Sequence, residues 1–100
     1  MLMTLVALTE KSLDRLYGLS KTALSRRHKL IVFLYSQGVR IILHEKFKDL
    51  EELEGLRLLA CQTSLRECGL DPSNHLKLET SSLSELVELI ERSDHVIFLR

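Results

Sequence analysis

The stretch LIVFLYSQG, residues 30–38, decides the fold class of this chain. Its first six residues are apolar and rich in β-branched and aromatic side chains, and the polar residues and glycine at 36–38 then break the run. A continuous apolar run of this length is typical of a strand that is buried on both faces. Such strands occur in parallel sheets that are covered by helices. Residues 30–35 therefore predict one strand of an α/β sheet.

Strand-like and helix-like segments alternate on both sides of this run. Apolar or alternating segments at 2–8, 56–60, 75–80 and 95–99 predict four more strands. Helical spacing of apolar residues predicts a helix over 12–27, and a shorter helix at 62–68 is stopped by Gly69. A last helix begins at a capping box of Ser82 and Glu85, and its predicted buried face comprises Leu83, Leu86, Val87, Leu89 and Ile90. This order predicts a single α/β domain over residues 1–100, with a mostly parallel five-stranded sheet and helices on both faces.

Residues 39–54 leave several structures open. They fit a short helix or an extended turn followed by a helix that ends near Gly55, and Val39 to Leu43 also fit an extra strand. A domain of this size has a limited interior. We therefore expect the apolar residues of 39–50 to form an exposed contact surface between copies of the chain, unless they fill the core beside an extra strand.

Composition and charge narrow the range of partners. The chain has 100 residues, of which 45% are hydrophobic and 28% charged, as in ordinary globular proteins. Fourteen basic residues balance fourteen acidic ones, so neither nucleic acid nor a membrane is expected as a partner. No apolar run approaches the roughly 18 residues of a membrane span. The N-terminus lacks the basic segment that opens a signal peptide. We expect a cytoplasmic protein whose two cysteines stay reduced.

The residues suited to ligand binding or catalysis lie at the carboxyl edge of the predicted sheet. In parallel sheets, ligands bind beyond the carboxyl ends of the strands. Cys61 ends one strand, and the amides of the helix that follows can stabilise an anionic thiolate or persulfide there. Cys61 is therefore the candidate nucleophile. The residues expected to support its anion are Gln62, Thr63, Ser64 and Gly38.

Other interpretations of Cys61 stay open at this stage. A free cysteine often only fills space in a core. Cys61 and Cys68 are seven positions apart and do not match the close pairs of zinc sites, and no glycine-rich phosphate loop is present. We therefore expect neither a metal nor a cofactor. A Cys–His pair is not ruled out, because such partners meet only in the folded chain. A binding site for a nucleotide or another small molecule at the same edge is a further alternative.

Three segments resemble the DsrE-like family, a group of small sulfur-relay proteins with a flavodoxin-like sheet. They are ALSRRHKLIVFLYSQGV at 23–39, LRLLACQTSLRECGL at 56–70 and SSLSELVELIERSDHVIFL at 81–99. The resemblance implies that Cys61 accepts sulfur as a persulfide and passes it to another protein. It also implies a homo-oligomer, either a trimer or a hexamer. Some relatives have a second cysteine three positions after the first, where this chain has Ser64.

Two hypotheses follow. In the first, the chain is a cytoplasmic sulfur carrier, a possible sulfurtransferase, that takes sulfur from a protein donor onto Cys61 and gives it to a protein acceptor. In the second, the chain is a non-catalytic oligomeric subunit or binding module of a DsrE-like assembly, and Cys61 is unreactive. The reactivity of Cys61 distinguishes them.

Overall fold

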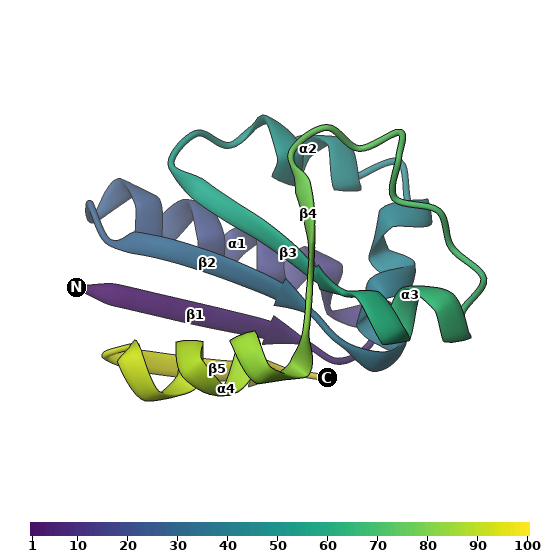
Figure 1. Ribbon diagram of the computed structural model, residues 1–100. Helices are drawn as coiled ribbons and strands as arrows, with labels where there is room; N and C mark the ends of the chain where they lie inside the picture. The colour runs from purple at the N-terminus through teal and green to yellow at the C-terminus, as the bar shows by residue number, and fades with distance from the viewer.

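The computed structural model describes all 100 residues and contains one five-stranded sheet. The strand order is β4-β3-β2-β1-β5, and every neighbouring pair is parallel (Figure 1). The predicted α/β fold is thus confirmed, with a sheet that is wholly parallel. The strands are β1 (Leu2–Ala7), β2 (Lys29–Leu34), β3 (Leu56–Cys61), β4 (Leu78–Ser81) and β5 (His95–Leu99).

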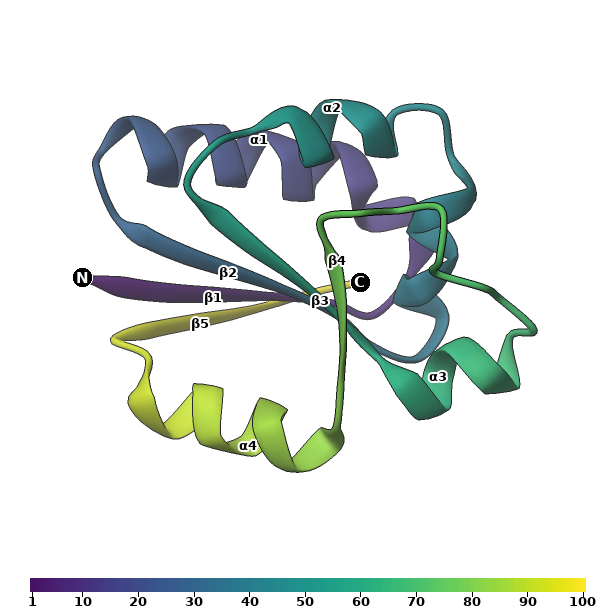
Figure 2. The ribbon, with the colours of Figure 1, turned by 45° about the horizontal axis from the view of Figure 1, so that its top comes forward.

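Helices cover the two faces of the sheet unequally. Figure 2 shows α1 and α2 on one face and α4 on the other, with α3 beyond the carboxyl end of β3. Each face has its own apolar cluster: 18 buried residues on the α1 side and 7 on the α4 side. The helices are η1 (Glu10–Ser12), α1 (Leu13–Ser25), η2 (Ser36–Leu43), α2 (Phe47–Glu52), α3 (Gln62–Glu67) and α4 (Leu83–Arg92), where η denotes a 3-10 helix.

The apolar run that predicted the sheet forms β2, its middle strand. Residues 30–34 are all buried, because β1 and β3 flank the strand and both core clusters draw side chains from it. Side chains alternate along a strand, so Val32 faces the α1 side whereas Phe33 faces the α4 side. Each strand side chain therefore has an apolar layer to enter.

The segment after β2 is a 3-10 helix, η2, and it belongs to the core. Val39 and Ile41 are fully buried and Ile42 is 6% exposed, whereas Leu43 is exposed. The expectation of an exposed contact surface over residues 39–50 is therefore wrong, as is the alternative of an extra strand. The 3-10 helix lies at the carboxyl edge of the sheet against η1 and α3, and its buried apolar side chains join the α1-side cluster.

The predicted fourth strand is shorter than the sequence pattern suggests. Only Leu78–Ser81 pair with β3. The preceding residues form turns instead, with the amide of His75 bonded to the carbonyl of Pro72 and the amide of Leu78 bonded to that of His75. His75 also contacts the α2 side of the molecule, since its Nδ1 lies 3.1 Å from a carboxylate oxygen of Glu51. Residues 75–77 therefore lie in turns, although the alternation of apolar and polar residues had predicted a strand from residue 75.

The last helix, α4, begins as predicted, but its buried face is narrower. The Ser82 hydroxyl accepts a hydrogen bond from the Glu85 amide at 3.2 Å, which is the first half of the capping box. The Glu85 carboxylate accepts from the hydroxyl of Ser81 and does not return to Ser82. Of the five residues expected to be buried, only Leu86 and Leu89 are; Leu83, Val87 and Ile90 are exposed. None of the helices has the length and apolar character needed to cross a bilayer.

Candidate functional site at the carboxyl end of β3

Cys61 lies at the point where the chain connections change face. It is the last residue of β3 and pairs with Ser81, the last residue of β4. After Cys61 the chain enters α3, whose Leu65 joins the cluster on the α1 side, whereas Ser81 leads into α4 on the opposite face. Neighbouring strands whose helices leave to opposite faces form a topological switch point, where open α/β sheets bind ligands. The fold therefore gives Cys61 the position expected of a functional residue.

Cys61 is also the N-cap residue of α3. Its backbone is extended, with φ −63° and ψ 120°, and its side chain makes no capping hydrogen bond. An N-cap side chain lies beside the first amides of its helix, which lack partners inside the helix. A thiolate or persulfide at this position can accept hydrogen bonds from these amides.

A cavity of about 120 Å³ adjoins Cys61. Its volume is several times the ~30 Å³ that one water molecule occupies in the liquid, so a second sulfur atom bonded to Sγ has room. Cys61 itself is only 3% exposed and packs in the α4-side cluster. A donor or acceptor must therefore reach the sulfur through this cavity. The other residues that line it are Tyr35, Thr63, Ser64, Glu67 and Leu83.

The cavity gathers some of the predicted site residues and leaves others outside. Of the four residues predicted to support an anion at Cys61, Thr63 and Ser64 line the cavity with it, whereas Gln62 and Gly38 do not. The amide of Gly38 already donates to the carbonyl of Tyr35 at 2.9 Å. The geometry therefore gives Gly38 a packing role and no role toward an anion at Cys61.

Ser64 connects the site to the loop after β2. Its hydroxyl oxygen accepts a hydrogen bond from the Ser36 amide at 2.9 Å. Ser36 has a φ of +56°, a conformation that is uncommon for residues other than glycine, and the Ser64 contact holds the amide of this turn. Ser64 is 5% exposed. It thus fixes the wall of the cavity.

Three lining residues were not predicted as part of the site: Tyr35, Glu67 and Leu83. Tyr35 follows β2 directly and Leu83 lies two residues beyond β4. Both residues follow strands that flank β3. The sequence shows that they follow strands, but only the strand order shows that these strands lie next to β3. Glu67 lies at the far end of α3, and no sequence pattern pointed to it.

Cys68 lies on the other side of α3. It packs against the α1-side cluster, whereas Cys61 belongs to the α4-side cluster. It lines a separate cavity of about 60 Å³ with Ser36, Gln37, Ser64 and Glu67. Both cysteines are free thiols. The two cavities share only Ser64 and Glu67, so these residues separate the two sulfur atoms.

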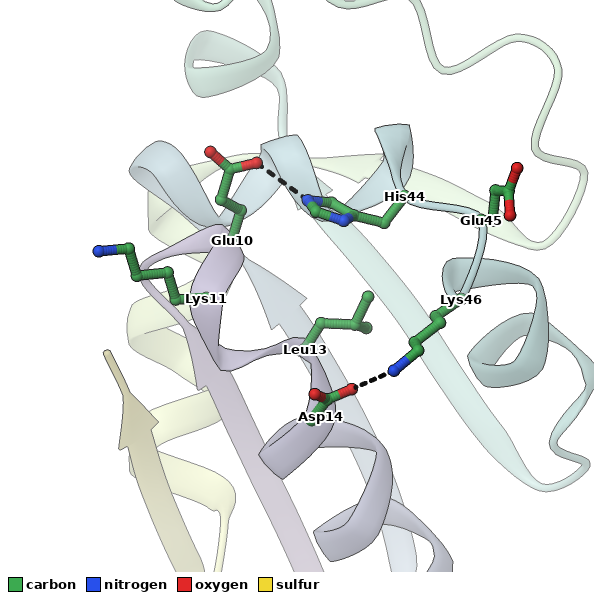
Figure 3. Close-up of a pocket in the computed structure, with 7 residues that line it drawn as sticks. All are labelled: Glu10, Lys11, Leu13, Asp14, His44, Glu45 and Lys46. Atoms are coloured by element: carbon green, nitrogen blue, oxygen red, sulfur yellow. Dashed lines mark hydrogen bonds and ion pairs between the residues drawn. The ribbon is translucent and has the colours of Figure 1, made fainter.

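The largest hollow of the molecule is elsewhere, and it carries paired charges. It measures about 440 Å³ and lies where η1 meets the end of η2 (Figure 3). His44 Nε2 lies 3.0 Å from a carboxylate oxygen of Glu10, and Lys46 Nζ lies 3.3 Å from one of Asp14. These four side chains are exposed and pair with one another, and no nucleophilic thiol lines the hollow. Nor does any group of three or more metal-binding side chains come together anywhere in the chain. Cys61 is therefore the stronger candidate.

Comparisons with known proteins agree with this fold. The model of the DsrE/DsrF-like family matches residues 2–99. No curated protein gives a significant match. The chain is similar in structure to the ychN protein from E. coli, with a TM-score of 0.76 and 16% sequence identity over 99% of this chain and 100% of that one. At this identity the likeness concerns the fold alone, but the family match spans almost every residue. The chain belongs to the DsrE/DsrF-like family.

Proposed function

We propose that the chain is a sulfur carrier that accepts sulfur as a persulfide on Cys61 and passes it to a partner protein. Membership of the DsrE/DsrF-like family associates the chain with sulfur relay. The observation that carries the proposal is the position of Cys61, which is both the N-cap of α3 and the cysteine that lines the cavity at the switch point. A persulfide is an anion. The free amides at the start of α3 can donate hydrogen bonds to it, and the cavity has room for its outer sulfur.

The reaction consists of two exchanges at sulfur. The Cys61 thiolate attacks the outer sulfur of a donor persulfide, a new S–S bond forms, and the bond between the two donor sulfurs breaks. The donor leaves as a thiolate. An acceptor thiolate then attacks the outer sulfur on Cys61 and releases the Cys61 thiolate. Neither exchange has a net oxidation or reduction, so neither requires a cofactor or a metal. Because the carrier thiol must stay reduced, the proposal places the protein in the cytoplasm.

The burial of Cys61 favours a second candidate, in which the chain is a non-catalytic subunit and Cys61 fills space. Cys61 is 3% exposed and packs with Phe33 and Leu86. Treatment with a small persulfide, such as cysteine persulfide, separates the two candidates. A carrier gains sulfur at Cys61, located by peptide mapping, and Cys61→Ser does not. If the wild type gains no sulfur at Cys61, the cysteine is a packing residue and the carrier proposal fails.

We also propose that the protein is a homo-oligomer, a trimer or a hexamer. The family resemblance supports this, and so does Leu76, which is 98% exposed in the loop before β4. The apolar residues Val39, Ile41 and Ile42 cannot supply the interface, because they are buried within the chain. Light scattering at micromolar concentration tests the proposal, since a mass near 11.5 kDa means a monomer.

A further inference from the structure

The outer flank of α4 carries an apolar stripe that nothing in the chain covers. Leu83, Val87 and Ile90 are 52%, 49% and 38% exposed, and they lie at positions i, i+4 and i+7, on one side of the helix. The helix contacts the sheet through Leu86 and Leu89 instead. The stripe therefore adds an apolar surface beside the buried face of α4.

The stripe is continuous with the Cys61 site. Leu83, its first residue, lines the cavity next to Cys61. A molecule that lies along α4 and contacts Leu83 is thus at the entrance to the reactive sulfur. The stripe and the site form a single surface, and a partner that exchanges sulfur with Cys61 must approach it.

Acidic side chains border this surface. Glu88 and Glu91 run beside the stripe on the outer face of α4, and Glu67 lines the Cys61 cavity. None of the three forms an ion pair within the chain. The only basic residue of α4 is Arg92, at its far end. The surface is therefore apolar along its centre and negatively charged along its border.

We propose, on the basis of the sulfur-carrier function, that this surface docks the sulfur partner, and that the partner presents its cysteine beside an apolar segment flanked by lysine or arginine. Apolar contact with the stripe supplies affinity. Complementary charge steers the encounter and selects the partner. A two-fold contact of stripe on stripe between two copies of this chain is a poorer arrangement, since it would bring their Glu88 and Glu91 side chains together. A contact of the stripe with another surface of a second copy is an outcome of the test below.

Two synthetic peptides test the inference on Cys68→Ser protein, in which Cys61 is the only thiol. Each peptide carries one cysteine as its persulfide within the same apolar segment, and lysines flank the segment in one peptide and glutamates in the other. We expect Cys61 to gain sulfur from the lysine peptide ~10-fold faster at low ionic strength. The preference should largely vanish at 1 M salt, where the screening length is ~3 Å. Equal rates for the two peptides at low salt would overturn the inference.

Variants of α4 make the test specific. Glu88→Lys with Glu91→Lys should reverse the preference between peptides, and Val87→Ser should slow both. Transfer from cysteine persulfide, which needs no docking, should stay at the wild-type rate in all of them. An unchanged peptide preference in the charge-reversed protein contradicts the inference. A lower oligomeric mass in Val87→Ser also contradicts it, because the stripe would then bind a second copy of the chain.

The carrier function itself has a separate test. If cysteine persulfide fails to load the wild type, the carrier function is refuted, whereas failure of the docking inference alone leaves this loading intact.

Discussion

Replacing Gly38 with alanine should destabilise the protein strongly, because the added methyl group meets backbone. A Cβ at Gly38 would lie 1.9 Å from the carbonyl oxygen of Ala7 and 2.6 Å from its carbonyl carbon, whereas real Cβ contacts essentially never fall below 3.0 Å. The loop must therefore retreat by about 3.0 − 1.9 = 1.1 Å. Val39 and Ile41, both fully buried, follow directly and would move with it. Overpacking typically costs ~1–3 kcal/mol, and we expect the upper end, about 3 kcal/mol, because no side chain can yield.

Thermal unfolding followed by circular dichroism measures this loss. At ~4–8 °C per kcal/mol for a domain of this size, Tm should fall by about 12 °C or more. The matched control is Gly18→Ala, at an exposed position within α1 where nothing lies within 4 Å of the added Cβ. This control should gain ~0.5–1 kcal/mol, since alanine is the better helix former. If Gly38→Ala melts at the wild-type temperature while Gly18→Ala melts higher, the packing of η2 against the end of β1 is wrong.

Three further predictions concern the second thiol, the core and one ion pair. Cys68→Ser should load sulfur at Cys61 as the wild type does, and air oxidation should not join the two cysteines, because they belong to opposite clusters; peptide mapping that finds the bridge in good yield contradicts this. Ile42→Glu should unfold the chain rather than dissociate an oligomer, since Ile42 is 6% exposed, and native circular dichroism in this variant would refute its place in the core. A hydrogen bond from Arg57, at 2.9 Å, lowers the pKa of Glu79 below 4.5 despite partial desolvation. The pair therefore stabilises the fold above about pH 4.5 and loses its effect as the pH falls further. Because both side chains are half exposed, Glu79→Gln should lower the free energy of unfolding by less than ~1 kcal/mol at pH 7. An equal loss at pH 2 would contradict the ion pair as its cause.

The sequence predicted the parts of the fold that depend on local pattern. The apolar run of β2 predicted a buried strand of a helix-covered sheet, and Gly69, with φ +66°, ends α3 where expected. The short helix followed by a second helix was one of the structures left open for residues 39–54, and it is the one that forms. Predictions about residues whose environment depends on tertiary contacts were wrong. The expected exposure of Val39 and Ile41 was wrong, because nothing local reveals that the segment after β2 packs against η1 and α3 at the edge of the sheet.

The candidate site likewise contains residues that the local sequence could predict and residues that it could not. The position of Cys61 at a strand end with a helix behind it is a local feature, and Thr63 and Ser64 come with it. Tyr35 and Leu83 enter the site only because β2 and β4 flank β3, and the strand order is not visible in the sequence. The exposure of the α4 stripe was hidden for a related reason. Helical periodicity shows which residues share a face, but not how much of that face the sheet covers.

The central claim is that Cys61 both accepts and releases sulfur, and one labelling experiment tests both steps. The protein is loaded from cysteine persulfide whose outer sulfur is isotopically labelled, freed of donor, and then mixed with glutathione, while intact mass and label are followed. The wild type should gain about 32 Da, the mass of one sulfur atom, and should lose it as an equal amount of label appears on glutathione. Cys61→Ser should neither gain mass nor transfer label. Equal loading of Cys61→Ser and the wild type, or label that stays on the protein in the presence of glutathione, would contradict a carrier role for Cys61.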